Sequence, residues 1–163
     1  VSETNYKIRV ALLDGTKDRT IKINKNPDKR WVQFYFDEDH GKEIEPDSQN
    51  WHLLFTQYTD FDITTDGDTI PYLVRGALLN AENIEVAYID DIDFKDINSS
   101  TIGRLQFSLA HNAIGYNWKY FSLNDGVYTI VPGISYVIKE INGNYYKLRF
   151  LGFYNDNGLK GYP

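Results

Sequence analysis

An Asn-Gly turn near the end of the sequence limits the fold more than any other feature. Two runs of β-branched and aromatic residues, Ile134–Ile141 and Tyr145–Tyr154, flank the tripeptide Asn142-Gly143-Asn144. Asn and Gly tolerate the positive φ that a tight hairpin turn requires, so this pattern is a strong hairpin signal. We therefore predict that these two runs form an antiparallel hairpin.

The second run of this hairpin alternates between two kinds of side chain. Lys147 and Arg149 fall on one face because successive residues of a strand point to opposite sides of the sheet. The other face carries the residues expected to pack, namely Tyr146, Leu148, Phe150 and Gly152. The alternation predicts one face toward a core and one toward water.

The rest of the chain consists of short apolar or aromatic runs separated by turn residues, without helical periodicity. We expect strands at Tyr6–Leu13, Thr20–Asn24, Trp31–Phe36, Asn50–Tyr58, Tyr72–Leu79, Ile84–Ile89, Leu105–Leu109, Trp118–Leu123 and Val127–Val131. Both faces of Asn50–Tyr58 are substantially apolar, which predicts a strand covered on both sides. Asp60–Asp68 is polar and turn-like, and Ala110–Asn117 is expected to be a loop. An aromatic content of 15% also favours sheet.

Strand number and spacing predict an all-β, antiparallel fold, a β-sandwich or barrel-like single domain spanning residues 1–163. The net charge of −6 and the absence of any long basic run argue against nucleic acid as a partner. The sequence contains no Cys, which excludes disulfides and thiolate chemistry. No motif for a catalytic nucleophile, a phosphate loop or a zinc protease is present, so we predict that the protein is not an enzyme.

A set of segments in this order resembles the HmuY family, the haem-binding surface lipoproteins of Bacteroidetes. The similarity extends over roughly residues 20–163 and is weakest over 60–105. The matching residues are Trp31–Phe36 with the turn to Gly41, Asn50-Trp51 with Phe55 and Tyr58, Trp118–Leu123, Tyr136–Lys139, Asn142–Asn144, Tyr146–Phe150, Phe153-Tyr154 and Gly158–Gly161. The resemblance implies an all-β protein at the outer membrane, cell surface or periplasm, with a function in iron acquisition. It also implies that a lipid-anchored N-terminal segment and a last strand lie outside this sequence.

The resemblance further implies haem as a cofactor, held between two His in the way known for this family. One of these His lies in a mid-chain loop and the other just after the Trp-x-x-Phe-Ser strand. Leu123 stands at the second position, and Leu cannot ligate iron. Met, which replaces His in some relatives, is absent from this chain.

The remaining candidates for an iron ligand are imidazole and phenolate groups. His111, in the loop Ala110–Tyr116, is the best of them, with Tyr116 and Tyr72 as further candidates. His40 lies in an acidic turn and is expected to be an ordinary exposed histidine. His52 lies in an apolar strand and is expected to be buried.

A cluster of carboxylates lies in the polar stretch after the Asn50–Tyr58 strand. It comprises Asp60, Asp62, Asp66 and Asp68, and its spacing does not match that of an EF-hand calcium loop. We expect a solvated turn here, and no metal site.

Two functions from different classes follow. The first is a non-enzymatic cell-envelope lipoprotein that binds haem or another flat apolar ligand, with an outer-membrane receptor as a further partner. The alternative is a surface accessory or adhesion module, without haem, that binds a glycan or an outer-membrane protein through its Tyr and Trp side chains. Solvent-exposed aromatic clusters would favour the alternative.

Overall fold

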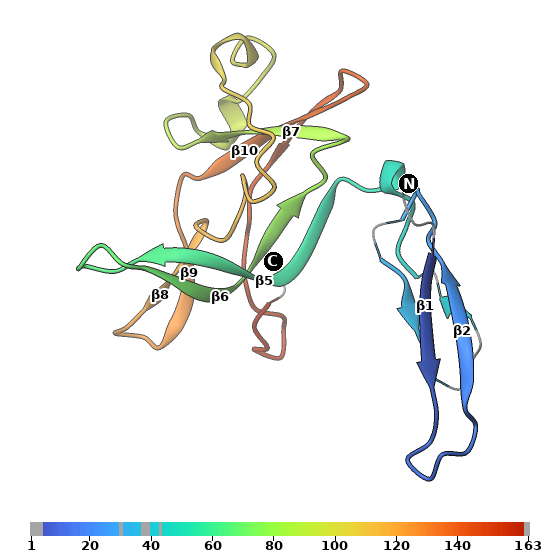
Figure 1. Ribbon diagram of the computed structural model, residues 1–163. Coiled ribbons are helices and arrows are strands. Elements are labelled where there is room, and N and C mark those ends of the chain that lie inside the picture. The colour runs from blue at the N-terminus through green and yellow to red at the C-terminus, as the bar shows by residue number, and fades with distance from the viewer. Residues whose placement is uncertain (1–4, 30, 37–39, 43, 162–163) are drawn as a thin grey trace. The chain divides into compact units, whose positions relative to one another are not determined.

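Internal contacts divide the chain into two compact units, Val1–Trp51 and His52–Pro163. The computed structural model describes residues 5–29, 31–36, 40–42 and 44–161 of the chain. Each unit is built from antiparallel strand pairs, and the helical elements of the described residues are three short 3-10 turns (Figure 1). The all-β, antiparallel fold predicted from the sequence is confirmed. The prediction of a single domain stays a prediction.

The first unit is a ribbon of two strands followed by short elements. Strand β1 (Asn5–Val10) pairs with β2 (Arg19–Asn24), and Ile21 and Ile23 of β2 are its buried hydrophobic side chains. The short elements are β3 (Gln33–Phe34), β4 (Gly41–Lys42) and the 3-10 turn η1 (Ser48–Asn50). The acidic residues Asp37–Asp39 that precede His40 lie outside the described part of the chain.

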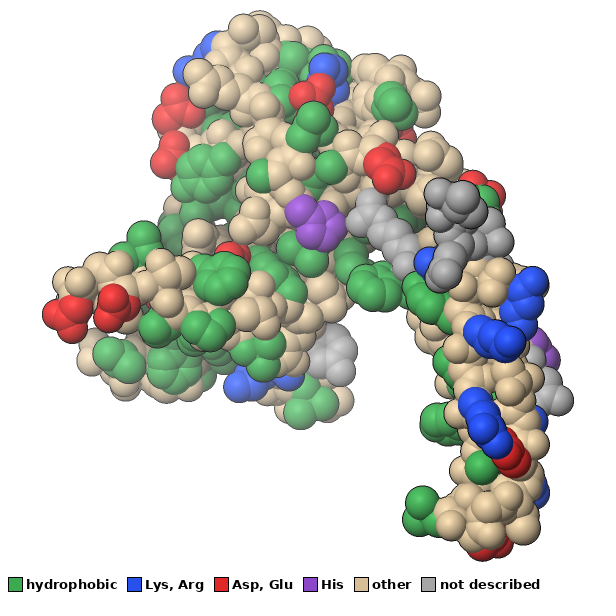
Figure 2. Space-filling model, viewed as in Figure 1, with side chains coloured by type: hydrophobic (Ala, Val, Ile, Leu, Met, Phe, Trp, Pro, Cys, Tyr) green, Lys and Arg blue, Asp and Glu red, His purple; other side chains and the backbone are tan. Residues whose placement is uncertain are grey.

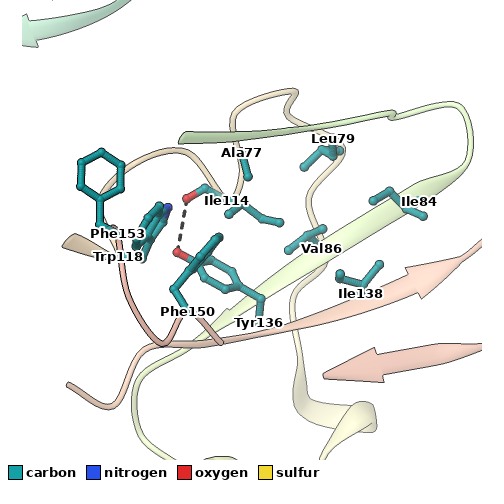
Figure 3. Packing of buried hydrophobic residues seen from close by; sticks show 10 residues of the cluster. All are labelled: Ala77, Leu79, Ile84, Val86, Ile114, Trp118, Tyr136, Ile138, Phe150 and Phe153. Carbon is teal, nitrogen blue, oxygen red and sulfur yellow. Dashed lines mark hydrogen bonds between the residues drawn. The ribbon is translucent and has the colours of Figure 1, made fainter. Parts of the chain in front are cut away.

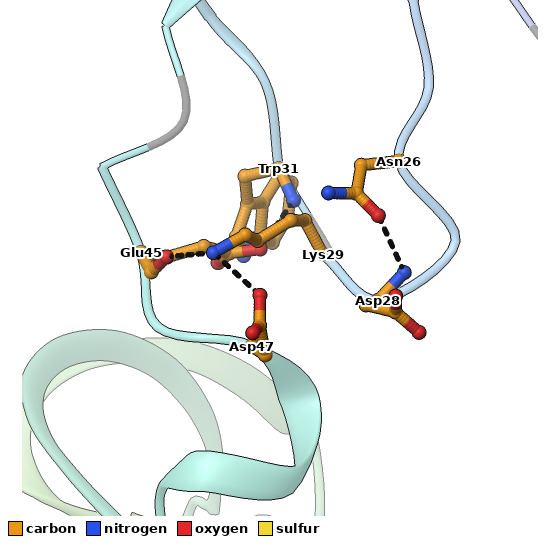
Figure 4. A network of polar contacts seen from close by, with 6 residues as sticks. All are labelled: Asn26, Asp28, Lys29, Trp31, Glu45 and Asp47. Carbon is orange, nitrogen blue, oxygen red and sulfur yellow. Dashed lines mark hydrogen bonds and ion pairs between the residues drawn. The ribbon is translucent and has the colours of Figure 1, made fainter.

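A polar network joins the two ends of the segment that follows β2 (Figure 4). The ammonium of Lys29 donates to the carbonyl of Glu45 at 2.6 Å and pairs with the Asp47 carboxylate at 2.8 Å. The amide of Trp31 donates to the Glu45 carboxylate at 2.8 Å. Because the Lys29 side chain is largely shielded from water, these contacts fix the segment more firmly than an exposed ion pair would.

The second unit begins with a long hairpin. Strand β5 (Leu53–Ile63) pairs with β6 (Thr69–Leu79) in unbroken register from Leu53↔Leu79 to Ile63↔Thr69. The prediction of a turn over Asp60–Asp68 is therefore wrong for its first half. Asp60 and Asp62 alternate with Phe61 and Ile63, and continuous pairing with β6 outweighs the low strand propensity of Asp.

The centre of the second unit is a three-stranded sheet of order β11–β10–β7. Its strands are β7 (Ile84–Ile89), β10 (Ser135–Glu140) and β11 (Tyr145–Leu148). Side chains on one face of β7 and β10 enter the main core, whereas Ile89 and Val137 on the other face pack with Ile97. Strand β10 is thus covered on both faces. The 3-10 turns η2 (Phe94–Asp96) and η3 (Ile102–Arg104) follow β7.

Trp118 lies in the main core (Figure 3), just before β8 (Lys119–Ser122), which pairs with β9 (Val127–Ile130). Its indole is 1% exposed and stacks on Phe150 with the ring centroids 3.8 Å apart. The indole N–H donates to the carbonyl of Gly115 at 3.1 Å, and the Tyr136 hydroxyl donates to that of Ile114 at 3.3 Å. Each buried polar group on these two rings is therefore satisfied, as a stable core requires.

The C-terminal hairpin forms at its predicted turn, where Gly143 has φ of 87°. The predicted division of its faces holds for Lys147 and Arg149, which are exposed, and for Phe150, which is buried, but not for Tyr146, which is 53% exposed. The ammonium of Lys147 also donates to the carbonyls of Phe94 and Ile97 at 2.8 and 3.0 Å.

Two other expectations differ from the structure. The segment Leu105–Leu109 is not a strand, because the single bridge Val86↔Ser108 is its only pairing with the other described residues. Strand β5 is not covered on both sides, since Leu54 and Phe55 are exposed. The predicted loop at Ala110–Asn117 is confirmed. Among the described residues, no helix has the length and apolar character needed to cross a membrane.

Candidate functional site

The candidate site depends on a close contact between β6 and the loop 110–117. The amides and carbonyls of Ala77 and Gly115 exchange two hydrogen bonds of 3.0 Å. A Cβ on Gly76 would lie 2.2 Å from the carbonyl oxygen of Gly115, so only Gly allows this approach. Gly115 itself has φ of 62°, which turns the chain toward Tyr116 and β8. The two glycines thus bring Tyr116 and β8 beside β6.

A cavity of about 490 Å³ lies between β6 and β8, next to this contact. Its volume is in the range of small-molecule binding sites. The lining residues are Gln57, Asp62, Tyr72, Leu73, Val74, Arg75, Tyr116, Asn117, Lys119, Tyr120, Phe121, Tyr128, Phe153 and Lys160. The cavity therefore combines aromatic rings with three cationic side chains and one carboxylate.

The aromatic rings of the lining contact one another. The rings of Tyr72 and Tyr116 are 6.3 Å apart, and Tyr128 lies 5.3 Å from Phe121 and 5.0 Å from Phe153. Rings at these separations pack against one another, so the aromatic wall of the cavity consists of these two groups. A flat ligand in the cavity would meet ring faces and edges from β6, β8, β9 and the C-terminal segment.

Two of the phenols have raised pKa values. The neighbouring Tyr128 phenol and then burial raise the pKa of Tyr72, with a smaller contribution from Asp62. Burial raises the pKa of Tyr116, and the charges of Asp62 and Asp60 raise it further. Both groups are therefore neutral hydrogen-bonding phenols at physiological pH unless a cation binds to them.

The cations of the lining come from three separate segments. Arg75 belongs to β6, Lys119 to β8, and Lys160 to the C-terminal segment. Gly161 lies against the guanidinium of Arg75, and its amide donates to the carbonyl of Phe153 at 2.8 Å. The C-terminal segment thereby folds over β6 and places Lys160 at the cavity.

The structure brings together two of the three residues singled out in the sequence. Tyr72 and Tyr116 both line the cavity, whereas His111 does not. The side chain of His111 is exposed, and its carbonyl accepts a hydrogen bond from the amide of Leu79 at 2.9 Å, farther along β6. Leu123 is 88% exposed and is also outside the lining.

The other titratable candidates lie elsewhere. His52, expected to be buried, is half-exposed and lies 3.2 Å from the Glu140 carboxylate. His52 precedes β5, whose pairing with β6 begins only at Leu53, so its side chain is not enclosed by the sheet. Asp60 accepts a hydrogen bond from the Asn112 side chain at 3.2 Å. No group of three or more metal-ligating side chains occurs within residues 5–29, 31–36, 40–42 and 44–161.

The sequence interpretation missed the three cations of the cavity. Only one of them left a local signal, because Lys119 is a lone charge within the aromatic stretch Trp118–Phe121. Arg75 and Lys160 lie 44 and 41 residues from it along the chain, and only the fold brings them close.

Comparison with known proteins identifies the family of this chain. A family model described as HmuY protein matches residues 28–163, which is more than half of the sequence and includes every residue of the cavity lining. No curated protein and no solved structure matches. The chain therefore belongs to the HmuY protein family.

Proposed function

We propose that this protein is a non-enzymatic binding protein of the cell envelope that holds haem or a haem-like flat ligand in the cavity between β6 and β8. The observation that carries the proposal is the cavity itself, about 490 Å³ in volume, with an aromatic wall and three cations. Membership of the HmuY protein family supports a ligand of the haem type. The aromatic wall is suited to a flat apolar body, and the cations to acidic groups at its edge.

The residues present fit haem in part. Haem supplies a flat macrocycle, two carboxylates and an iron that accepts phenolate as well as imidazole ligands. Tyr72 and Tyr116 are the phenols that would approach such a ligand, because both line the cavity. The two-His arrangement has no counterpart here, because Leu123 occupies one of its positions. We propose Tyr72 or Tyr116 as the iron ligand, with His111 as the competing candidate.

A haem titration of the purified protein tests this proposal. We expect a saturable, shifted Soret band at micromolar protein. Tyr72→Phe or Tyr116→Phe should change its position and weaken binding about tenfold, because a phenolate–iron bond is lost. His111→Ala is the comparison variant, and a larger effect there would make His111, and neither Tyr72 nor Tyr116, the iron ligand. Absence of any saturable Soret shift in the wild-type protein would reject haem.

We further propose the biological setting that the family indicates. The protein acts in iron acquisition at the outer membrane, cell surface or periplasm, attached by a lipid and working with an outer-membrane receptor. Both units belong to one functional domain in this proposal, which the family match supports because it starts at residue 28, within the first unit. Fractionation of cells that express the tagged full-length protein, with and without globomycin, tests the lipid anchor.

A second function, glycan binding, is favoured by aromatic side chains of the first unit. Trp31, Tyr35 and Phe36 are exposed, and the ammonium of Lys42 lies 5.7 Å from the ring of Tyr35. Exposed aromatic faces are suited to stacking against sugar rings. If this function holds, Trp31→Ala should abolish binding on a glycan array, and Tyr146→Ala, at an exposed ring of the second unit, should leave it unchanged.

A further inference from the structure

The ammonium group of Lys119 is a positive charge that lies among the aromatic side chains of the cavity. The residue is only 7% exposed, and its ammonium lies 4.2 Å from the ring centroid of Trp118 and 4.6 Å from that of Phe153. The rings of Tyr128 and Tyr116 follow at 5.8 and 5.9 Å. Four rings therefore surround one positive charge.

No carboxylate balances this charge among the residues that the structure describes. The ammonium donates to the backbone carbonyls of Arg75 and Tyr116, which are neutral acceptors. An ammonium has three N–H donors, so two carbonyls do not use its full capacity. Burial lowers the pKa of Lys119 to about 8, which reflects the cost of this poorly compensated charge.

The cavity lining as a whole also carries a net positive charge. Arg75, Lys119 and Lys160 line the cavity together with a single carboxylate, Asp62. The whole chain carries a net charge of −6, so this concentration of cations is local and opposite to the protein average. Clefts lined by one sign of charge attract ligands of the other sign.

We infer that the cavity binds ligands that join a flat aromatic body to an anionic group, and that Lys119 pairs with that group. The anion supplies the partner that the ammonium lacks, while the rings of Tyr72, Tyr116 and Phe121 hold the flat body. This inference rests on the proposed function in placing the ligand in the cavity, but it does not require the ligand to be haem.

A purely structural Lys119 is the competing explanation. Cation–π contacts stabilise a lysine without any ligand, so the same geometry would then serve only the packing of β8. The two explanations differ in one measurable respect. A ligand-pairing lysine makes the cavity discriminate between anionic and neutral forms of the same aromatic molecule, and a structural lysine does not.

The test uses two fluorescent probes that share one ring system. 8-Anilinonaphthalene-1-sulfonate carries a sulfonate, and N-phenyl-1-naphthylamine is its neutral counterpart. Each is titrated into the intact chain at pH 7 and low salt. We expect the wild-type protein to bind the anionic probe at least tenfold more tightly. Lys119→Met should bring the two affinities within about twofold by weakening only the anionic probe.

Two control variants test whether the discrimination between the probes depends on the positive charge at position 119 or on the net charge of the protein. Lys95→Met removes an equally charged, highly exposed side chain outside the lining, and should leave the discrimination unchanged. Lys119→Arg keeps the positive charge and should keep most of the discrimination. This variant and the wild-type comparison remain informative if Lys119→Met does not fold, which circular dichroism would detect.

The outcomes distinguish this inference from the haem proposal. Equal affinity of the wild-type protein for both probes, or discrimination that survives in a folded Lys119→Met, would overturn the inference. Haem and haem dimethyl ester are titrated in parallel. Equal, saturable binding of both haem forms would keep the haem proposal and overturn the inference. Lys119-dependent discrimination between the dyes without any Soret shift would keep the inference and reject haem.

Discussion

The two halves of β6 are both rich in apolar residues but have opposite environments. In the first half, Thr69–Leu73, every residue is exposed, although Ile70, Tyr72 and Leu73 are large and apolar. In the second half, Val74–Leu79, every residue except Arg75 is buried. Figure 2 shows hydrophobic side chains at the surface along the β5–β6 arm.

The difference between the halves has an identifiable cause. The second half has the loop 110–117 on its free edge, held by the Ala77–Gly115 bridge, and its side chains enter the main core. Among the strands that the structure describes, the first half pairs with β5 alone. Apolar character along a strand therefore does not decide burial, and the exposed half remains available to line the cavity.

Trp118→Ala should show the largest effect, because it removes the ring around which the buried half packs. We expect a loss of about 3–5 kcal/mol in the free energy of unfolding, from lost burial plus the cavity left behind. Chemical denaturation followed by circular dichroism measures it.

The matched control lies beside the exposed half of β6. Phe61 of β5 pairs with Pro71 and is 66% exposed, so Phe61→Ala should cost about 0.5 kcal/mol or less. Equal losses for the two variants would mean that both halves are packed in solution, contrary to the comparison.

Gly76→Ala should have the next largest effect on stability, because the added methyl would disrupt the contact between β6 and Gly115, which is made by the buried half only. The added methyl would lie 2.2 Å from the backbone oxygen of Gly115, and backbone cannot move aside as a flexible side chain does. We expect a loss of about 2–3 kcal/mol and faster amide hydrogen exchange at Ala77 and Gly115.

Gly103→Ala is the control for this substitution. A Cβ on Gly103 meets no atom within 4 Å, and its φ is not in the left-handed region, so stability should change little. Unchanged exchange rates in Gly76→Ala would show that the loop is held by other contacts.

Lys119→Met should have an effect that appears in the pH dependence of the free energy of unfolding. The ammonium of Lys119 donates to the carbonyl of Arg75, next to the boundary between the two halves of β6. The pKa of Lys119 is about 8 in the folded chain and about 10.4 when unfolded. Between these values the unfolded chain binds more protons, so the contribution of Lys119 to the free energy of unfolding rises with pH, by about 3 kcal/mol. The wild-type protein should therefore gain stability relative to Lys119→Met between pH 8 and 10.4.

Two further comparisons isolate this effect. Lys95→Met should show no such trend relative to the wild-type protein, because that lysine is highly exposed. Burial raises the pKa of Tyr58 to about 12. Above pH 10 the unfolded chain therefore releases the Tyr58 proton while the folded chain keeps it, and both the wild type and the Lys119→Met variant should lose stability. A flat difference between wild type and Lys119→Met across pH 8–10.4 would contradict the depressed pKa.

Much of the fold followed from local sequence patterns. The Asn142-Gly143 turn, the all-β class and the loop 110–117 were predicted, because each depends on the residues within a short window. The extension of β5 through Asp60 and Asp62 was missed, because it depends on pairing with β6. The sequence also singled out Tyr72 and Tyr116, without indicating that they lie beside each other.

Turn chemistry, strand periodicity and the absence of Cys and Met are properties of the sequence by itself. They determined an antiparallel β protein whose ligand donors are limited to imidazole, phenol and carboxylate groups. Tertiary structure alone decided which apolar residues are buried, and that Arg75, Lys119 and Lys160 share one cavity. The physical reason is that hydrogen-bonded turns form between near neighbours, whereas burial and charge clustering depend on segments more than 40 residues apart.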